Sequence, residues 1–394
     1  MQPLLENGID GLKLDRSDWQ VVKFGDVAIQ QKQSVDRVNT DLTRYVKGEH
    51  MYSEDLHLRE WGELKDEYLG PAFIRKFEEG DILYGSRRTY LRKTVIAPFD
   101  GITSNTTFVI KANEGRINKI LLPFIMLSEG FAQHSIRNSK GSVNPYVNWK
   151  DLSGYEFLLP SFEKQKKLAD FLTLNDEALE AKKRLYIYLE QYLKSREYEE
   201  YEGESRALNV KLKNLLLKTL SGGTPDTSNR FFYDKGITPW ITTRLLNNTY
   251  VDSGECYITS LAVETSAAKV LPKGNVLAGT RVGVGKFSIN NVDMSFSQDI
   301  IGLLFDHDLI DVEFLIHQLN SFVFRHKLLA FARGTTIKGI TKDDLLELLV
   351  YVPAKDDQEK IKKDFLSIKS AIKSCERELL SLKSIQKSII NQVF

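Results

Sequence analysis

The 394-residue sequence predicts an α+β protein made of two tandem mixed α/β domains, each followed by a long helix. Segments of the first half recur in the same order in the second half. After each domain the composition changes to a long, charged, glycine-free stretch. We expect the two long helices to pair with each other as an antiparallel coiled coil. The predicted boundaries are 1–160 for the first domain, 161–203 for the first helix, 204–354 for the second domain and 355–394 for the second helix.

The repeat is clearest in two short segments. GDILYGSRR at 80–88 matches GNVLAGTRV at 274–282, 194 residues later. Residues 138–172 match 331–366 in the same way, with a glycine, an Asp-Leu pair, a proline and a glutamine recurring in order. Solenoid repeats are only about 20–50 residues long. We therefore interpret the pattern as a duplicated domain.

Each domain combines short strands with one helical stretch. Runs rich in β-branched and aromatic residues, bounded by glycine and asparagine, predict strands. They lie at 93–99, 106–112, 300–306 and 347–353. The stretches 118–136 and 311–332 each predict a single helix.

The two charged stretches carry apolar residues at alternating spacings of four and three, which is typical of a coiled-coil seam. Each helix would be about 40 residues, or about 60 Å, long. Asn175, Lys182 and Gln386 interrupt the seam, and such polar residues often specify the register. The alternative is that each helix only covers its own domain, but such long helices would overhang domains of this size. The residues predicted to pair the helices are Leu168, Leu172, Leu179, Leu189, Ile361, Phe365, Ile368, Ile372, Leu379 and Leu382.

The overall composition excludes several classes of protein. Two cysteines and six scattered histidines predict neither a disulfide framework nor a metal site. No apolar run approaches the length of a membrane span and no signal peptide is evident, so we expect a cytoplasmic protein. The net charge of +1 does not by itself indicate a nucleic-acid partner.

The distribution of charge is more informative than its sum. Four windows, 82–99, 130–150, 265–292 and 314–342, contain lysine and arginine but no acidic residue. Lysine and arginine neutralise phosphates, while arginine, asparagine and glutamine can read base edges. The alternative is that these windows are solvated basic faces. The candidate DNA-binding residues are Ser86, Arg87, Arg88, Tyr90, Arg92, Lys93, Lys140, Asn144, Thr243, Arg244, Thr280, Arg281, Lys286, Arg333 and Lys338.

No catalytic constellation emerges from the sequence. GTRVGVGKF at 279–287 has five residues between its first glycine and its Gly-Lys pair, where a phosphate-binding loop has four, and Phe287 follows in place of serine or threonine, so it does not match. VNPYV at 143–147 lacks the second proline of the amino-methyltransferase motif. We predict no catalytic residues and no cofactor bound by this chain.

The order of domain, helix, domain and helix resembles the specificity subunit of type I restriction–modification enzymes. DRSDWQVVKFGDVA at 15–28 and RYVKGEH at 44–50 resemble the beginning of the family's first target-recognition domain. LSGGTPDTSNRFFYDKGITPWITTRLL at 220–246 and ARGTTIKGITKDDLLELLVYVPAKDDQEKI at 332–361 resemble the beginning and end of its second. The first domain lacks the GGTP segment.

The resemblance implies that each domain reads one half of a bipartite DNA target and that the paired helices set the spacer. It also implies two methyltransferase subunits, which would bind S-adenosylmethionine and flip out the target adenine, and restriction subunits with a motor and nuclease. The Ser86-Arg87 and Thr280-Arg281 pairs, common to both domains, would contact phosphates.

Three other functions stay open at this point. The chain could be the specificity subunit of a type IIB-like enzyme, whose partner fuses methylation and cleavage. It could also be a coiled-coil adaptor that does not touch DNA, or an enzyme that acts on nucleic acid alone.

Overall fold

The computed structural model describes residues 16–36, 39–66, 68–202, 209–333 and 339–394. The chain divides into two compact units, of which the first comprises Met1–Lys183 and Arg377–Phe394 and the second Arg184–Glu376. The boundary between the units falls inside both long helices, each of which was predicted as one undivided segment. We call the described residues up to 160 head 1 and residues 209–354 head 2.

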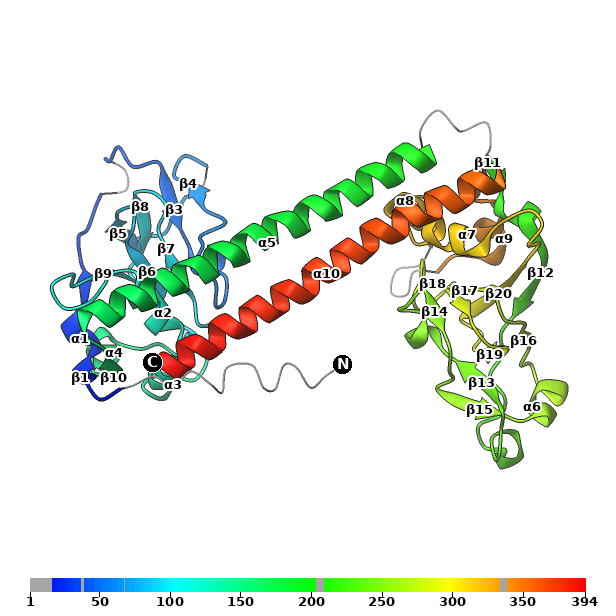
Figure 1. Cartoon of the computed structure of the whole chain (residues 1–394), viewed down its shortest axis with the longest axis horizontal. Coiled ribbons are helices and arrows are strands. Elements are labelled where there is room, and N and C mark those ends of the chain that lie inside the picture. Colours follow the sequence, from blue (N-terminus) through cyan, green and yellow to red (C-terminus); the bar gives the residue numbers. More distant parts are fainter. Residues whose placement is uncertain (1–15, 37–38, 67, 203–208, 334–338) are drawn as a thin grey trace. The chain divides into compact units, whose positions relative to one another are not determined.

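Head 1, in unit 1, contains three sheets within its described residues (Figure 1). The first pairs β1 (Gln20–Lys23) with β10 (Glu156–Leu159). The second has the order β2 (Ala28–Gln31), β9 (Thr107–Ala112), β6 (Ile82–Gly85), β7 (Thr94–Ile96), and the third β4 (Gly62–Glu63), β3 (Arg44–Val46), β8 (Gly101–Ser104), β5 (Phe73–Phe77). The helices and 3₁₀ turns are α1 (Phe24–Val27), η1 (Gly48–His50), η2 (Thr89–Leu91), α2 (Leu121–Leu127), α3 (Glu129–Arg137) and α4 (Trp149–Leu152).

Head 2, in unit 2, repeats this plan among its described residues. β11 (Asn209–Lys211) pairs with β21 (Leu349–Tyr351). A second sheet has the order β12 (Leu216–Ser221), β20 (Ile300–Phe305), β17 (Val276–Gly279), β18 (Phe287–Asn290), β14 (Tyr250–Val251), and a third β15 (Cys256–Ile258), β13 (Thr238–Ile241), β19 (Met294–Phe296), β16 (Val270–Leu271). The helices and 3₁₀ turns are η4 (Leu212–Leu215), η5 (Arg230–Phe232), η6 (Thr243–Leu245), α6 (Ser260–Thr265), α7 (Val312–Leu319), α8 (Phe322–Phe331) and α9 (Lys342–Glu347).

The pairing registers confirm the duplication. In head 1, Gly85 of β6 lies opposite Thr107 of β9, and in head 2, Gly279 of β17 lies opposite Ile300 of β20. β3 runs parallel to β8 as β13 runs parallel to β19, and the neighbouring strands are otherwise antiparallel apart from β14 and β18. Both β6 and β17 are buried because successive residues enter different hydrophobic cores, Ile82 and Leu83 in head 1 and Val276 and Leu277 in head 2.

The prediction of a single helix at 118–136 and at 311–332 is wrong. Each stretch folds into two helices, α2 and α3 in head 1 and α7 and α8 in head 2. Ser128 and Ser321 sit at the breaks in extended backbone, and each hydroxyl accepts a hydrogen bond from the third residue of the next helix. Serine is a strong N-cap, so it starts a new helix inside an apolar run.

The two long helices are α5 (Phe162–Glu202) and α10 (Lys355–Val393), as predicted to within two residues at each end. A buried glutamine fastens the first turn of each helix to its head. Gln165 accepts from the Asn118 N–H at 2.7 Å and donates to the Pro160 carbonyl at 3.0 Å. Gln358 repeats both bonds with Asp311 and with Pro353, each at 2.8 Å. This explains why the sequence repeats a polar residue at a buried position.

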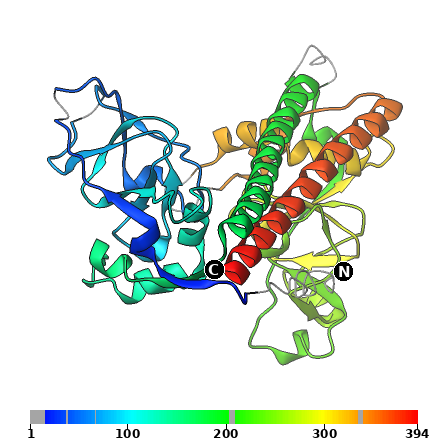
Figure 2. The same ribbon diagram turned by 60° about the vertical axis from the view of Figure 1, so that its left-hand side comes forward.

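The helices are antiparallel within each unit. In unit 1, Leu172 near the start of α5 shares a hydrophobic core with Ile389 and Val393 near the end of α10 (Figures 1 and 2). In unit 2 the rings of Tyr201, near the end of α5, and Phe365, near the start of α10, stack at 5.5 Å. All ten residues predicted to pair the helices are buried or half-buried. None of the helices in the described ranges is long and apolar enough to cross a membrane.

Each head also contacts the helix of the other repeat within its unit. The Glu129 N–H, at the start of α3, donates to Asn391 of α10 at 2.7 Å. The Phe322 N–H, at the start of α8, donates to the buried Glu197 carboxylate of α5 at 2.8 Å. Both bonds satisfy a helix N-terminus, whose first N–H groups have no partner inside the helix.

Candidate nucleic-acid interface

Two loops with 44 residues between them in the sequence lie together in head 1. The Val147 N–H donates to the Ser86 carbonyl at 2.9 Å, and the Arg88 N–H donates to the Pro145 carbonyl at 2.6 Å. The first loop, 86–93, joins β6 to β7, and the second, 138–147, follows α3. The two acid-free windows of the first domain therefore form one surface, which we call face 1.

Head 2 builds the same arrangement. The Ile340 N–H donates to the Thr280 carbonyl at 2.8 Å, equivalent to the bond between Val147 and Ser86. Loop 280–286, between β17 and β18, thus lies against the described ends of the loop 333–340, and we call this surface face 2. Lys338, predicted to bind DNA, lies outside the described residues.

The hydroxyls of Ser86 and Thr280, which recur in the two heads, form hydrogen bonds inside the fold. Ser86 is 6% exposed and donates to the Thr106 carbonyl at 2.6 Å, and Thr280 is 5% exposed and donates to the Asp299 carbonyl at 3.2 Å. A buried hydroxyl that is already bonded inside the fold does not reach a phosphate. We therefore correct the expectation that both hydroxyls face DNA, and assign them to holding the loops.

The repeated arginines have the opposite environment. Arg87 and Arg281 are exposed, and neither guanidinium forms an ion pair with a residue in the described ranges. An exposed, uncompensated guanidinium at the same place in both heads fits a contact to the DNA backbone.

Face 1 holds its remaining exposed side chains in a defined shape. The Arg88 Nε donates to the side-chain Oδ1 of Asn144 at 2.9 Å, and the Thr89 and Ser139 hydroxyls are 2.8 Å apart. Tyr90 is 53% exposed beside them. The face thus presents cationic, amide and aromatic groups together, and DNA contact by Arg88, Tyr90 and Asn144 stays a prediction.

Arg92 and Lys93 have internal contacts that the sequence did not reveal. The Arg92 guanidinium, only 16% exposed, lies 3.0 Å from the Glu54 carboxylate and 2.7 Å from that of Glu129. The Lys93 ammonium donates to the Gly48 carbonyl at 2.6 Å. Both residues anchor loop 86–93, and we correct their predicted role from DNA contact to positioning.

The predicted cations Lys140 and Arg333 are equivalent to each other. Lys140 lies 3.1 Å from Asp151, and Arg333 lies 3.6 Å from Asp344, one repeat later. Both cations are largely exposed, so these ion pairs are weak and leave the charge available to a phosphate.

In face 2 a 3₁₀ turn lies beside the hairpin loop. Thr243 is buried under Gly283, where an added Cβ would come within 3.2 Å of the threonine Cβ. Arg244, on the same turn η6, is exposed, whereas the Lys286 ammonium donates to the side chain of Asn247 at 2.6 Å. Of this predicted group Arg244 is therefore the best placed for DNA, while Thr243 and Lys286 support the surface.

The equivalent turn of head 1, η1, carries a residue that sequence reasoning missed. Glu49 is exposed on η1, whose Gly48 carbonyl accepts the hydrogen bond from Lys93. Burial lowers the pKa of Lys93, the charge of Glu49 opposes this shift and that of Arg88 reinforces it. A single acid outside the basic windows gives no sequence signal, since only the fold brings it to face 1.

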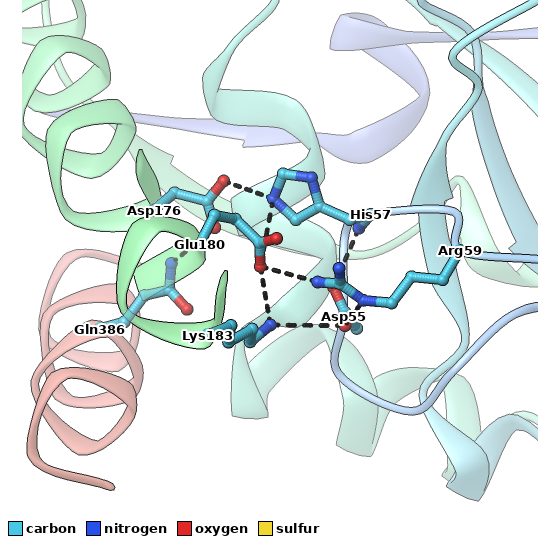
Figure 3. A network of polar contacts seen from close by, with 7 residues as sticks. All are labelled: Asp55, His57, Arg59, Asp176, Glu180, Lys183 and Gln386. Carbon is cyan, nitrogen blue, oxygen red and sulfur yellow. Dashed lines mark hydrogen bonds and ion pairs between the residues drawn. The ribbon is translucent and has the colours of Figure 1, made fainter. Parts of the chain in front are cut away.

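A polar network that the sequence did not reveal joins head 1 to α5 (Figure 3). The His57 imidazole lies 2.8 Å from the Asp176 carboxylate, and the Arg59 guanidinium donates to Glu180 at 2.7 Å. The hydrogen bond to Asp176 raises the pKa of His57. The full network consists of Asp55, His57, Arg59, Asp176, Glu180, Lys183 and Gln386. On α5 its three residues share one helix face, which fixes head 1 on the helix pair of unit 1.

Comparison with known proteins identifies the repeated unit. The model of the type I restriction modification DNA specificity domain matches the chain twice, over residues 16–191 and 209–382. Each match contains one head and most of the long helix that follows it. The family is therefore matched over most of the chain.

Individual relatives agree with this result. The EcoR124I/EcoR124II specificity subunit of Escherichia coli is 27% identical over 187 residues, 46% of this chain and 44% of that protein. The MjaIX specificity subunit of Methanocaldococcus jannaschii is 25% identical over 44% of this chain and 38% of that protein. These two matches thus span less than half of each relative's length. The putative MjaX specificity subunit of the same organism is 20% identical over 95% of this chain and 92% of that protein.

Solved structures share the fold. The HsdS subunit from Thermoanaerobacter tengcongensis superimposes with a TM-score of 0.50 at 18% identity, covering 98% of each chain. The S subunit from M. genitalium gives a TM-score of 0.56 at 12% identity, covering 97% of this chain and 98% of that one. With two copies of the specificity domain along its length, this chain belongs to the family of type I restriction–modification DNA specificity proteins.

Proposed function

We propose that this chain is the sequence-specific DNA-binding specificity subunit of a type I restriction–modification enzyme, and that each head reads one half of a bipartite target. The proposal rests on one observation. The same pair of loops is built twice, with an exposed arginine at the same place, Arg87 in face 1 and Arg281 in face 2.

The faces divide into a shared frame and differing neighbours. The bonds of Ser86 and Thr280 hold the loops in both heads, and the exposed cations Lys140 and Arg333 also recur, so neither pair of residues discriminates between sequences. Phosphate contacts position a protein on DNA, whereas contacts to base edges supply specificity. Sequence reading therefore falls to residues that differ between the faces.

The chain acts with catalytic partners and supplies the recognition itself. We assign methylation to two methyltransferase subunits that bind S-adenosylmethionine, and translocation and cleavage to restriction subunits, with assembly in the cytoplasm. One solved structure with the same fold, at a TM-score of 0.60 and 18% identity, comes from work described as the structural basis of complex assembly and conformational transition of the type I R-M system.

The proposal is tested by mapping methylated adenines genome-wide in cells that contain the partner subunits, with and without this gene. We expect one bipartite, non-palindromic motif to be methylated only when the gene is present. Arg87→Glu and Arg281→Glu should each reduce methylation and weaken the salt dependence of DNA binding by the assembled methyltransferase, because each reverses the charge of a phosphate contact.

Two charge reversals at the other end of the same sheets provide matched controls. Lys119 lines a cavity with Gly80, which precedes β6, whereas Arg87 follows β6. Lys273 is exposed and likewise precedes β17. Lys119→Glu and Lys273→Glu should leave methylation unchanged. Unaltered DNA binding by both arginine variants would favour a coiled-coil adaptor, and cleavage by a methylating partner without a separate translocase would favour a type IIB-like enzyme.

A further inference from the structure

The turns η1 and η6 occupy the same position in the two heads. β3 and β13 both run parallel to their neighbours, with Val46 opposite Thr103 and Ile241 opposite Phe296. Glu49 lies three residues after Val46 in head 1, and Arg244 lies three residues after Ile241 in head 2. The repeated fold thus places an acid and a base at one equivalent site.

Both side chains are exposed at the edge of their face. The Glu49 side chain is 71% exposed, and its ion pair with Lys47 is long, at 3.6 Å. Its turn is tied to loop 86–93 through the Lys93–Gly48 bond of 2.6 Å. Arg244 is exposed on a turn packed under Gly283, and it forms no ion pair with a residue in the described ranges.

The opposite charges cannot serve the same contact. A carboxylate on a surface that carries Arg87 and Arg88 repels phosphate, so it weakens binding unless a DNA group donates a hydrogen bond to it. In the major groove the group that suits a carboxylate is the N4 amino group of cytosine, whereas guanidinium donates two bonds to O6 and N7 of guanine.

We propose that Glu49 and Arg244 are specificity-determining residues, reading a cytosine in the half-target of head 1 and a guanine in that of head 2. This inference rests on the proposed function and assigns base contacts within it. The Lys93–Gly48 bond holds η1 and the packing of Gly283 against Thr243 holds η6, and the residue at this site sets the base that each head prefers.

The test uses the chain assembled with its own methyltransferase subunits and oligonucleotides that carry the mapped target with single base changes. Glu49→Gln keeps the size of the side chain but replaces the carboxylate by an amide, which pairs with adenine through N6 and N7. We expect preference for cytosine at one position of one half-target to fall by about tenfold and adenine to gain there. Arg244→Ala should reduce the preference for guanine at one position of the other half-target by a similar factor.

Two comparisons separate base reading from general effects. Glu114→Gln, on an exposed carboxylate that lines the cavity with Gly80 at the other end of the sheet, should leave all preferences unchanged. Arg244→Lys keeps the charge but cannot form the bidentate hydrogen bonds of a guanidinium, so it should retain DNA affinity and lose the preference for guanine.

The outcomes are distinct. Altered preference at one position of the matching half-target supports the inference. An unchanged motif, or an equal change for all sequences, overturns it, because Glu49 and Arg244 would then act only through the general field of the face. A wild-type complex that methylates no bipartite motif would instead refute the proposed function.

Discussion

Replacing Arg92 should loosen loop 86–93 of head 1 without unfolding the head. Its guanidinium is paired with Glu54 and Glu129, and its backbone has a φ of 50°, which costs a residue other than glycine about 1–2 kcal/mol. The loop is therefore held in a strained shape by two ion pairs.

The size of the effect follows from these contacts. Charge-assisted bonds contribute about 1.5–3 kcal/mol each when buried, but the two carboxylates are partly exposed, so we take about 1 kcal/mol for each pair. Arg92→Ala loses both pairs and keeps the strain, which predicts about 2 kcal/mol, or about 30-fold more frequent opening of the loop. Arg92→Gly also loses both pairs but relieves about 1 kcal/mol of backbone strain.

Hydrogen exchange measures this opening directly. The amides of Leu91 and Arg92 donate to the Arg88 and Thr89 carbonyls, so their exchange reports on the turn. We expect protection from exchange to decrease from wild type to Arg92→Gly to Arg92→Ala. Exchange in loop 280–286 of head 2 should be the same in all three. Exchange within twofold of wild type in Arg92→Ala, or faster exchange in the glycine variant, would refute the reasoning.

Three further predictions concern stability. Because Asp176 raises the pKa of His57 above 6.5, their contact should stabilise unit 1 below pH 6.5 and lose this contribution as the pH rises through the raised pKa. We expect the unfolding free energy of wild-type unit 1 to fall by at most about 1 kcal/mol between pH 5.5 and 8.5, because the site is partly exposed. Chemical unfolding of His57→Gln over the same range should not show this decrease. Gly222→Ala would place a Cβ 2.1 Å from the Ser297 carbonyl oxygen, so head 2 should melt at a lower temperature in calorimetry while head 1 is unaffected. Leu172→Ala should lower the unfolding free energy of unit 1 by about 2–5 kcal/mol in urea titrations, because the fully buried side chain would leave a cavity; a loss below 1 kcal/mol would contradict the assigned core position.

Much of the fold was predictable because it depends on local periodicity and on duplication. The seam spacing that includes Leu172 and Phe365 defines one face of each helix, whatever surrounds it. The repeated Gln165 and Gln358 already marked equivalent places, although their role became clear only when both proved to fasten a helix to a head. The breaks at Ser128 and Ser321 were missed because an N-cap serine is a weak signal inside a long apolar run.

The candidate site was only partly predictable. The sequence alone determined the two domains, the two long helices, the basic windows and the equivalence of Arg87 with Arg281. Tertiary structure decided which cations are available, turning Arg92 inward to two glutamates, and it brought Glu49 onto a face whose sequence windows contain no acid. The physical reason is that periodicity and composition describe neighbours along the chain, whereas the partner of a charge is chosen by contacts between segments far apart in sequence.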